Sequence, residues 1–290
     1  MAARSEPYVD LHLHTVASDG TLTPAQLVDY ASSRGYRAVA VTDHDSWESI
    51  GGAQALGSRV GLEVIPGIEL STNLDEREIH VLGYFIDHND RVFQAKVAHF
   101  RQARVERAAR IVEKLSAMGV RIELPRVLQI AAGGAVGRPH LARALQELGY
   151  VGSVDEAFAR YLGAGCPAYV GKDFLTPEES FALVHEAGGL AFFAHPGIEN
   201  CDDLIDGFVA AGLDGLEVWH AKHTPAQARH YQEIAAQRGL LVSGGSDYHG
   251  DGLGGGAPRN QVRVPYQVVE RMKERLSEAT LRKWNQTVIE

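Results

Sequence analysis

The stretch Tyr8-Val-Asp-Leu-His-Leu-His-Thr15, near the start of the chain, decides the fold. Its apolar residues alternate with aspartate and histidine, which is the period of a β-strand with one face on an apolar core. His12 and His14 stand two residues apart, so their imidazoles point to the same side of the strand and can share one metal ion. Alone, such a pair also fits the solvated face of a strand.

Short apolar runs alternate with helical patterns before and after the middle of the chain. We expect strands at 8–16, 38–42, 63–70, 79–86, 190–194, 215–219 and 240–243. Helices are expected between them at 24–34, 49–60, 177–187, 203–211 and 225–238, with a last helix at 266–284. Because strand and helix alternate, these patterns predict βαβ units, a mainly parallel sheet and a barrel-like α/β fold of about seven strands. An open doubly wound sheet is the alternative.

The middle of the chain is helical in pattern. From Val92 the apolar residues follow one helical stripe, and no strand pattern returns until 168–170, with further helices expected at 124–132, 140–148 and 154–161. We therefore expect residues 1–95 and 170–290 to form a barrel with a metal site, and residues 96–169 to form an all-helical insertion that contributes to the substrate site. The arginines from Arg101 to Arg110 fit a solvated helix face and could also border an oligonucleotide path.

Composition excludes several classes of protein. With 290 residues, 45% of them hydrophobic and 22% charged, the chain can bury a large core. A formal charge of −9 argues against duplex DNA binding but leaves room for a short anionic ligand in a local pocket. Two cysteines cannot build a disulfide framework. No apolar run approaches a membrane span and no secretory core is present, so we expect a cytoplasmic protein with no membrane partner.

Histidines and carboxylates gather where the predicted strands end. After the first pair come Asp19, the Thr-Asp-His-Asp segment at 42–45, Glu69, His80, His195 and the Asp247-x-His249 pair. The carboxyl ends of parallel strands meet on one face of such a fold, which is where functional sites lie. Each fragment is a weak signal alone, but together they predict one metal-binding cluster. His220 fits either a supporting position beside that cluster or core packing.

These motifs resemble those of the PHP (polymerase and histidinol phosphatase) superfamily of metal-dependent phosphoesterases along nearly the whole chain. The matching segments are DLHLHT at 10–15, SDG at 18–20, TDHD at 42–45, GIELS at 67–71, HVLGY at 80–84, AHP at 194–196 and GGSDYHG at 244–250. The GRPHLA segment at 137–142 resembles the branch of nucleoside 3′,5′-bisphosphate phosphatases and 5′-to-3′ exoribonucleases. The resemblance implies a distorted seven-stranded β/α barrel with a helical insertion.

The resemblance also implies two to three divalent metal ions. It assigns His12, His14, Glu69 and Asp247 to one ion, Glu69, His80 and His195 to a second, and Asp19, His44 and His249 to a third. Imidazole and carboxylate ligands without thiolate fit Mn²⁺, Fe²⁺ or Zn²⁺, and we expect Mn²⁺.

The expected reaction is hydrolysis of a phosphomonoester of a nucleotide or a short RNA end. A hydroxide made by the metals would attack phosphorus, so no side chain is expected to act as nucleophile. Arg138, His140, His223 and Lys172 are the candidate substrate-binding residues, because cationic groups bind phosphate. Many relatives carry lysine where this chain has Cys166, so one phosphate contact is expected to be missing.

Two other functions fit the same residues. A histidinol-phosphate phosphatase could use the same metals, although Arg138 and His140 in the insertion point away from it. A non-catalytic metal-binding PHP module is the other alternative, although all nine expected ligand positions are filled.

Overall fold

The computed structural model describes residues 6–74, 77–131, 135–171, 175–250, 262–278 and 280–281. These residues form one eight-stranded sheet in the order β7-β6-β5-β4-β3-β2-β1-β8. The strands are β1 (Tyr8–Leu13), β2 (Ala38–Val41), β3 (Glu63–Leu74), β4 (Arg77–Tyr84), β5 (Leu190–Phe193), β6 (Gly215–His220), β7 (Leu241–Gly245) and β8 (Val264–Pro265). The sequence predicted seven of them and missed β8, which has only two residues.

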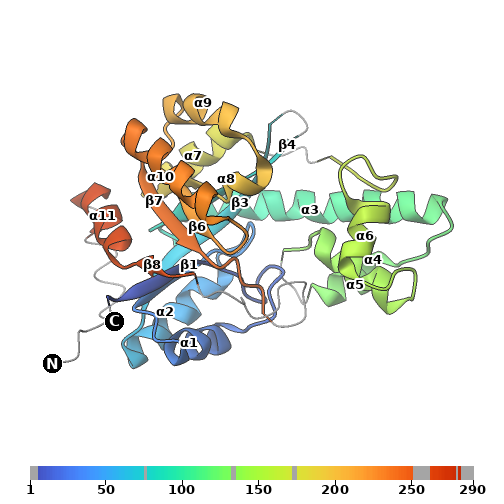
Figure 1. Ribbon diagram of the computed structural model, residues 1–290. Coiled ribbons are helices and arrows are strands. Elements are labelled where there is room, and N and C mark those ends of the chain that lie inside the picture. Colours follow the sequence, from blue (N-terminus) through green and yellow to red (C-terminus); the bar gives the residue numbers. More distant parts are fainter. Residues whose placement is uncertain are drawn as a thin grey trace.

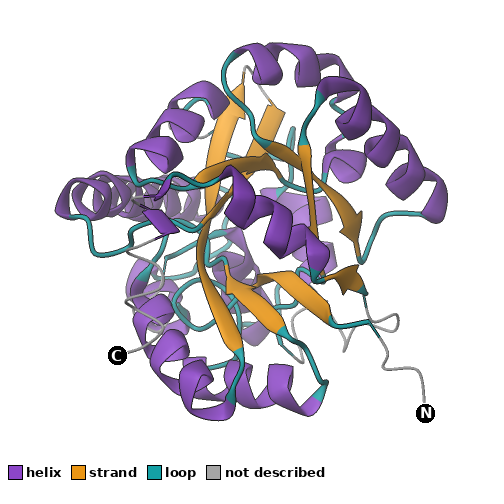
Figure 2. Ribbon diagram, turned by 90° about the vertical axis from the view of Figure 1, so that its left-hand side faces the viewer, coloured by secondary structure: helices purple, strands orange, loops and turns teal. Residues whose placement is uncertain are grey.

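The sheet curls into a nearly closed barrel, visible end-on in Figure 2. Past the end of β7, the backbone N–H of Asp247 donates to the carbonyl of His12 at 2.9 Å, and that of His14 donates to the carbonyl of Tyr248 at 3.1 Å. Gly245 comes so close to β1 that a Cβ there would lie 2.4 Å from the Cβ of His12. The predicted barrel is therefore confirmed, and the open sheet is wrong.

Helices surround the barrel strands (Figure 1). They are α1 (Pro24–Ser33), α2 (Glu48–Val60), α7 (Pro177–Glu186), the short α8 (Pro196–Glu199), the 3₁₀ turn η2 (Asp202–Leu204), α9 (Ile205–Ala210), α10 (Pro225–Arg238) and α11 (Gln267–Arg275). Three of them start with threonine followed by proline. Thr23, Thr176 and Thr224 each accept a hydrogen bond from the backbone three residues on, and each proline occupies the first helical turn, where it has no hydrogen bond to lose.

Strand β4 runs against its neighbours. It is antiparallel to both β3 and β5, whereas β1, β2 and β3 run parallel to one another, as do β5, β6 and β7. The prediction of a mainly parallel sheet missed this reversal. Because of it, the first residues of β4 lie at the end of the barrel where the parallel strands finish, and His80 pairs with Ser71 near the end of β3.

The insertion starts at the opposite end of the barrel. Helix α3 (Arg91–Ala117) has 27 residues and so extends for about 40 Å. Near its start Lys96 pairs with Glu186 at the end of α7, and further along Arg104 pairs with Asp45, which follows β2. The helix therefore runs along the barrel and projects beyond the end at which the parallel strands finish (Figure 1).

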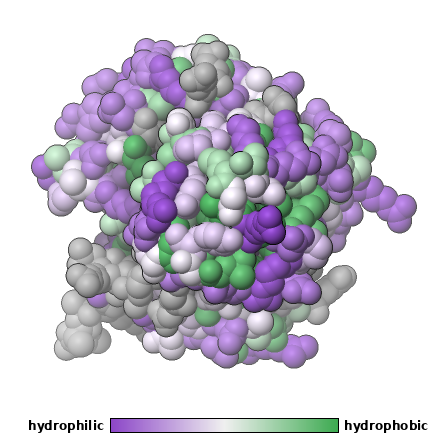
Figure 3. All heavy atoms as spheres, turned by 90° about the vertical axis from the view of Figure 1, so that its right-hand side faces the viewer, coloured by the Kyte–Doolittle hydropathy of each residue, from purple (hydrophilic) through white to green (hydrophobic). Residues whose placement is uncertain are grey.

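Beyond the barrel the chain forms a helical lobe, residues 105–170, with its own hydrophobic cluster. Its elements besides α3 are α4 (Leu124–Ile130), α5 (Arg138–Glu147), α6 (Val154–Ala157) and the π-helical turn η1 (Phe158–Leu162). Met118, Leu128 and Leu148 are its exposed large apolar side chains. Figure 3, which looks at this end of the molecule, shows hydrophobic residues interspersed with hydrophilic ones.

Two segments differ from the sequence prediction. Residues 168–170 alternate like a strand, but they form none, because the carbonyls of Tyr169 and Val170 accept from Lys114 and Arg107 of α3 instead of from another strand. The last helix, expected at 266–284, is interrupted after Arg275, because Leu276 adopts an extended conformation; residues 278, 280 and 281 are helical again, and residues 282–284 lie outside the described residues. No helix among the described residues is both long and apolar enough to cross a bilayer.

Candidate metal centre

All nine predicted ligand residues lie at one end of the barrel, called here the rim. His12 belongs to β1, His14 and Asp19 follow it, His44 follows β2, and Glu69 lies on β3. His80 is on β4, His195 follows β5, and Asp247 and His249 follow β7. The barrel thus brings together residues from the whole length of the chain.

The Glu69 carboxylate is at the middle of the cluster. Its Oε2 atom lies 3.2 Å from a ring nitrogen of each of His12, His14 and His44. Its Oε1 atom lies 2.8 Å from Nδ1 of His80 and 3.2 Å from Nε2 of His195. Glu69 itself is only 1% exposed, so all five imidazoles approach a carboxylate that water hardly reaches.

Two further carboxylates complete the cluster. Asp247 Oδ1 lies 3.2 Å from Nε2 of His14 and 3.5 Å from Nε2 of His12. Asp19 Oδ1 lies 3.2 Å from Nε2 of His249. The imidazoles of His14 and His249 stack with their centroids 4.0 Å apart. Because His14 contacts Asp247 and His249 contacts Asp19, this stacked pair of rings links the two aspartates.

The donor set fits divalent metal ions. Nε2 of His14 and Nδ1 of His44 are buried and have no hydrogen-bond partner in the described part of the chain, although each lies 3.2 Å from a Glu69 oxygen. Neighbouring ligand atoms about 2.1 Å from one metal ion are separated by about 3 Å when they meet at a right angle. The spacing and the unpartnered nitrogens are thus those of ligands around a shared cation.

Four groups of ligand atoms in the cluster are compact enough to hold an ion. They are His12, His14, Glu69 and Asp247; His14, Asp19, His44 and His249; His44, Glu69 and His80; and His12, Glu217 and His220. The first coincides with one group expected from the sequence. The second adds His14 to another, and the third contains His44 where the sequence grouping had His195.

Electrostatics keep the central carboxylates ionised. Burial alone would raise the pKa of Glu69, but the surrounding imidazoles, led by His44 and His12, hold it well below its usual value. Burial likewise opposes ionisation of Asp247, and His12 and His249 hold its pKa well below the usual range. Burial would lower the pKa of His14, which Asp247 and Glu69 raise to about 10. The cluster is therefore anionic at its centre and needs cations around it.

Strained backbone aims some of these side chains. Asp45, His195 and Asp247 have φ values of 44°, 30° and 53°, in the left-handed region that residues other than glycine seldom adopt. Asp45 lies four residues after the end of β2, and His195 and Asp247 lie two residues after the ends of β5 and β7. Such strain persists only where the surrounding structure imposes it, and it concentrates at functional sites.

Glu217 supports the cluster from β6; the sequence places it with His220 at the end of a predicted strand but assigns it no role. Its Oε1 accepts from Nδ1 of His12 at 2.9 Å, and its Oε2 accepts from the backbone N–H of His195 at 2.7 Å. With the proton of His12 on Nδ1, its Nε2 lone pair faces the cluster. A glutamate inside the otherwise apolar start of the strand sequence Gly215–His220 was the sequence signal that could have identified it.

His220 lies beside Asp247, with its side chain fully buried. Its Nδ1 accepts the backbone N–H of Lys222 at 3.2 Å, so its proton is on Nε2, 3.4 Å from Asp247 Oδ2. Of the two readings left open by the sequence, this geometry favours the supporting position.

A cavity of about 570 Å³ opens over the cluster. Its lining combines rim residues such as Glu69, His80 and Asp247 with Arg138, Phe158 and Tyr169 of the lobe. Nη2 of Arg138 lies 2.6 Å from Glu78 Oε2, and Oε1 of the same carboxylate lies 3.0 Å from Nε2 of His80. One glutamate thus ties the lobe arginine to the metal cluster.

The other expected substrate residues lie elsewhere. His140 is buried, and its Nδ1 accepts the N–H of Gly137 at 2.9 Å at the start of α5, so it caps a helix. His223 lines a different cavity, and its ring nitrogens bond to the carbonyl of Val218 and the N–H of Gly197. Lys172 lies outside the described residues. Cys166 donates to the carbonyls of Phe158 and Ala159, both in the first turn of η1.

Known proteins share this arrangement. A family model described as PHP domain matches residues 10–143. The 5′-3′ exoribonuclease Rnm of Escherichia coli is 36% identical over 247 residues, covering 83% of this chain and 84% of that protein. The chain belongs to the PHP family of metal-dependent phosphoesterases.

Two further comparisons agree with this membership. The 3′,5′-nucleoside bisphosphate phosphatase of Chromobacterium violaceum is 32% identical over 253 residues, covering 85% of this PHP chain and 89% of the relative. A crystal structure from Bifidobacterium adolescentis, described as a metal-dependent phosphoesterase, is 33% identical, covers 95% of this chain and 99% of its own, and superposes with a TM-score of 0.84.

Proposed function

We propose that this PHP phosphoesterase hydrolyses phosphomonoesters of nucleotides in the cytoplasm, with two to three Mn²⁺ ions held by the nine rim residues. The observation that carries the proposal is the shared cavity, in which the Arg138 guanidinium and the metal cluster face the same space. A substrate with one phosphate at the metals and a second anionic group at Arg138 fits this arrangement. A nucleoside 3′,5′-bisphosphate and the end of a short RNA both meet that description.

The metal-binding groups are His12, His14, Asp19, His44, Glu69, His80, His195, Asp247 and His249. Divalent ions bound there would lower the pKa of water and polarise the phosphoryl oxygens. The residues contain no thiolate, and imidazole mixed with carboxylate suits Mn²⁺, with Fe²⁺ and Zn²⁺ as the competing ions.

The residues of the chain position the substrate. Arg138 is 17% exposed and is held by Glu78, so its guanidinium is already oriented and keeps further N–H groups for an incoming phosphate. The rings of Phe158 and Tyr169 lie 5.5 Å and 5.8 Å from that guanidinium and offer flat surfaces for a base. The lobe would therefore bind the nucleoside while the rim binds the phosphate to be removed.

Hydrolysis joins the oxygen of one water molecule to phosphorus and breaks the bond between phosphorus and the ester oxygen. The products are inorganic phosphate and the free alcohol, and the proton released by the water compensates the one that the leaving oxygen takes up. Glu69, Asp19 and Asp247 keep the rim anionic enough to hold the cations that this step needs.

The test is a phosphate-release screen on the full chain loaded with Mn²⁺, Fe²⁺ or Zn²⁺, with metal content measured for each preparation. We expect release from adenosine 3′,5′-bisphosphate at a higher kcat/KM than from histidinol phosphate. The opposite order would favour the histidinol-phosphate phosphatase. No release from any nucleotide or from histidinol phosphate by metal-loaded protein would leave only the non-catalytic module.

A further inference from the structure

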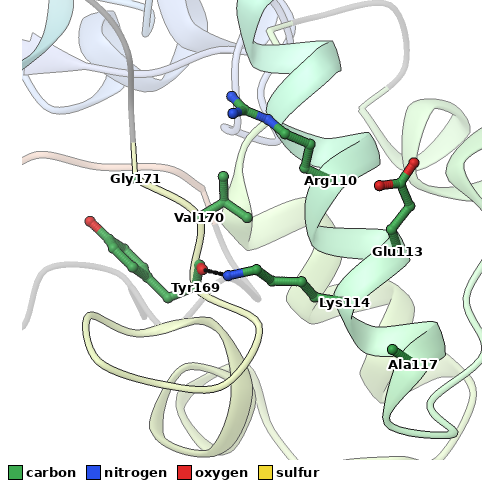
Figure 4. Close-up of a pocket in the computed structure, with 7 residues that line it drawn as sticks. All are labelled: Arg110, Glu113, Lys114, Ala117, Tyr169, Val170 and Gly171. Atoms are coloured by element: carbon green, nitrogen blue, oxygen red, sulfur yellow. Dashed lines mark hydrogen bonds between the residues drawn. The ribbon is translucent and has the colours of Figure 1, made fainter.

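A second cavity, of about 540 Å³, lies on the lobe beyond the metal cavity. One wall is α3, with Arg110, Lys114 and Ala117, and the other is the segment from Tyr169 to Gly171. Figure 4 shows the side chains of Arg110 and Lys114 directed toward this segment, whereas the carboxylate of Glu113 points to the other side of the helix. The side chains that face the opposite wall are therefore cationic.

Tyr169 belongs to both cavities. Its ring lies 5.8 Å from the guanidinium carbon of Arg138 and 6.0 Å from that of Arg107. Its backbone carbonyl accepts a hydrogen bond of 2.6 Å from Nζ of Lys114. The tyrosine is thus the common wall between the metal cavity and the lobe cavity, with cations on both sides of it.

Arg107 places a buried positive charge behind this wall, and it forms no ion pair among the described residues. It is 4% exposed, its Nε donates to the carbonyl of Val170 at 2.9 Å, and its Nη2 is buried without a hydrogen-bond partner. No carboxylate among the described residues pairs with it, whereas Arg104 has Asp45 and Arg138 has Glu78. Burial and the neighbouring Arg138 lower the pKa of Arg107 to about 10, so at neutral pH the charge remains and favours a nearby anion.

We propose that the cavity between Arg110, Lys114 and Tyr169 is a second nucleotide subsite, which binds the phosphate and base of the nucleotide next to the one held at the rim. This rests on the proposed function, because the first nucleotide must lie in the metal cavity. The ligand is then a single-stranded oligonucleotide that passes over Tyr169.

Single strands fit these features better than duplexes do. Proteins that hold a strand without reading its sequence combine a cationic groove with aromatic rings on which bases stack. Phe158 and Tyr169 provide rings in the metal cavity, and Tyr169 with Lys114 continues the same combination into the lobe cavity. A duplex would hide its base faces from these rings, and the net charge of −9 opposes a broad contact with it.

The decisive measurement is how kcat/KM depends on substrate length. The substrates are 5′-phosphorylated oligoadenylates of one to six nucleotides, and the enzyme is the metal-loaded full chain. We expect kcat/KM to rise between one and three nucleotides and then to level off. Lys114→Gln should lower the ratio of the value for three nucleotides to that for one, because it removes a cation of the lobe cavity. Tyr169→Ala should lower kcat/KM for every length by about tenfold for the loss of one base stack, because its ring also lines the metal cavity.

Two control variants separate binding from folding. Tyr169→Phe keeps the ring and should keep kcat/KM at every length, because stacking does not need the hydroxyl. Arg121→Gln removes an exposed arginine of the same lobe that lines neither cavity, and it should leave the ratio unchanged. A wild-type enzyme that hydrolyses mononucleotides without gain from added nucleotides would overturn the subsite and leave the proposed function standing.

A binding measurement gives a readout that does not depend on turnover. A fluorescent trinucleotide that carries a 5′-methylenephosphonate in place of the 5′-phosphate, which the enzyme cannot remove, is titrated into the metal-loaded full chain at several salt concentrations. One phosphate contact with a single strand contributes about 0.7 to the slope of log Kd against log salt. Arg110→Gln and Lys114→Gln should each reduce the slope by about that amount, and an unchanged slope in both variants would contradict the proposal.

Discussion

Polar groups at the barrel rim are buried and contact one another, whereas Arg107 and Lys114 on the helical lobe donate to backbone carbonyls. Glu69 is 1% exposed and touches five imidazoles, but Lys114 is exposed and bonds to the carbonyl of Tyr169. Rim side chains stand on strands whose spacing is fixed by the sheet. The lobe side chains stand on helices that meet the barrel along α3. We infer that rim substitutions change metal binding and that lobe substitutions change substrate affinity.

The largest effect should come from Glu69→Gln. Removing the central charge leaves five imidazoles without their shared carboxylate, so we expect the loss of at least one metal ion per chain. Phosphate release should fall at least about 1000-fold, since a Lewis-acid metal supplies several kcal/mol of transition-state stabilisation. Elemental analysis and phosphate-release kinetics check both.

Glu63→Gln is the matched control, because Glu63 begins the same strand at the other end of the barrel and pairs with Lys273. It should keep the full metal content. Wild-type metal content in Glu69→Gln would show that the rim does not bind metal through this carboxylate.

Gly245→Ala tests whether closure of the barrel holds the rim together. A Cβ there would lie 2.4 Å from both the backbone nitrogen and the Cβ of His12, so β1 or β7 must shift. We expect a loss of about 3 kcal/mol in the free energy of unfolding, measured by chemical denaturation. Gly207→Ala, in α9 with open space around its Cβ, should be neutral or stabilising. Equal stability of the two variants would mean that β1 and β7 tolerate separation.

Glu217→Gln should weaken metal binding without removing a ligand. The substitution leaves an amide where a carboxylate holds His12 and the backbone of His195. Loss of such a partner behind a ligating histidine costs about 10- to 100-fold in metal affinity. Competition with a fluorescent chelator measures the affinity, and a Kd within twofold of wild type would remove Glu217 from this role.

Arg138→Ala should have the smallest effect, and it should change substrate affinity, the property assigned to the lobe, and not metal binding. We expect KM for adenosine 3′,5′-bisphosphate to rise about tenfold, as for the loss of one charge-assisted hydrogen bond, with metal content unchanged. Glu78 keeps its contact with His80 in this variant. A fall in metal content with unchanged KM would show that Arg138 supports the rim and does not bind the substrate.

The sequence predicted best what depends on spacing within one strand. The His12 and His14 pair and the Asp247-x-His249 pair need only the two-residue period of an extended chain, together with the convergence of strand ends. The position of Glu217 behind His12 depends on barrel closure, which brings β7 against β1 and so places β6 one strand away from β1; no local pattern reveals this. The role of β4 depends on its reversed direction, which the apolar run at 79–86 does not encode.

Lobe residues were harder to predict, because a helix places neighbours on different faces. Arg138 and His140 are two residues apart in GRPHLA, yet the arginine faces the cavity and the histidine turns inward to cap α5. Ala168 and Val170 are buried in the lobe cluster, with the alternation of a strand. Arg107 and Lys114 donate to the carbonyls that a neighbouring strand would otherwise have used.

The length of α3 determines how far the lobe lies from the barrel rim. Because β4 returns the chain to the end of the barrel opposite the rim, α3 has to run the length of the barrel. Only its residues beyond the rim, which include Arg107, Arg110 and Lys114, belong to the lobe. Seven residues added between Lys96 and Arg101 would move the lobe about 10 Å further from the rim along the axis of α3 and nearly keep its orientation about that axis. One added residue would instead rotate the lobe by about 100° about the same axis. The number of whole helical turns in α3 thus sets the distance between the rim and the lobe. The residues left over beyond whole turns set the angle at which the lobe faces the rim.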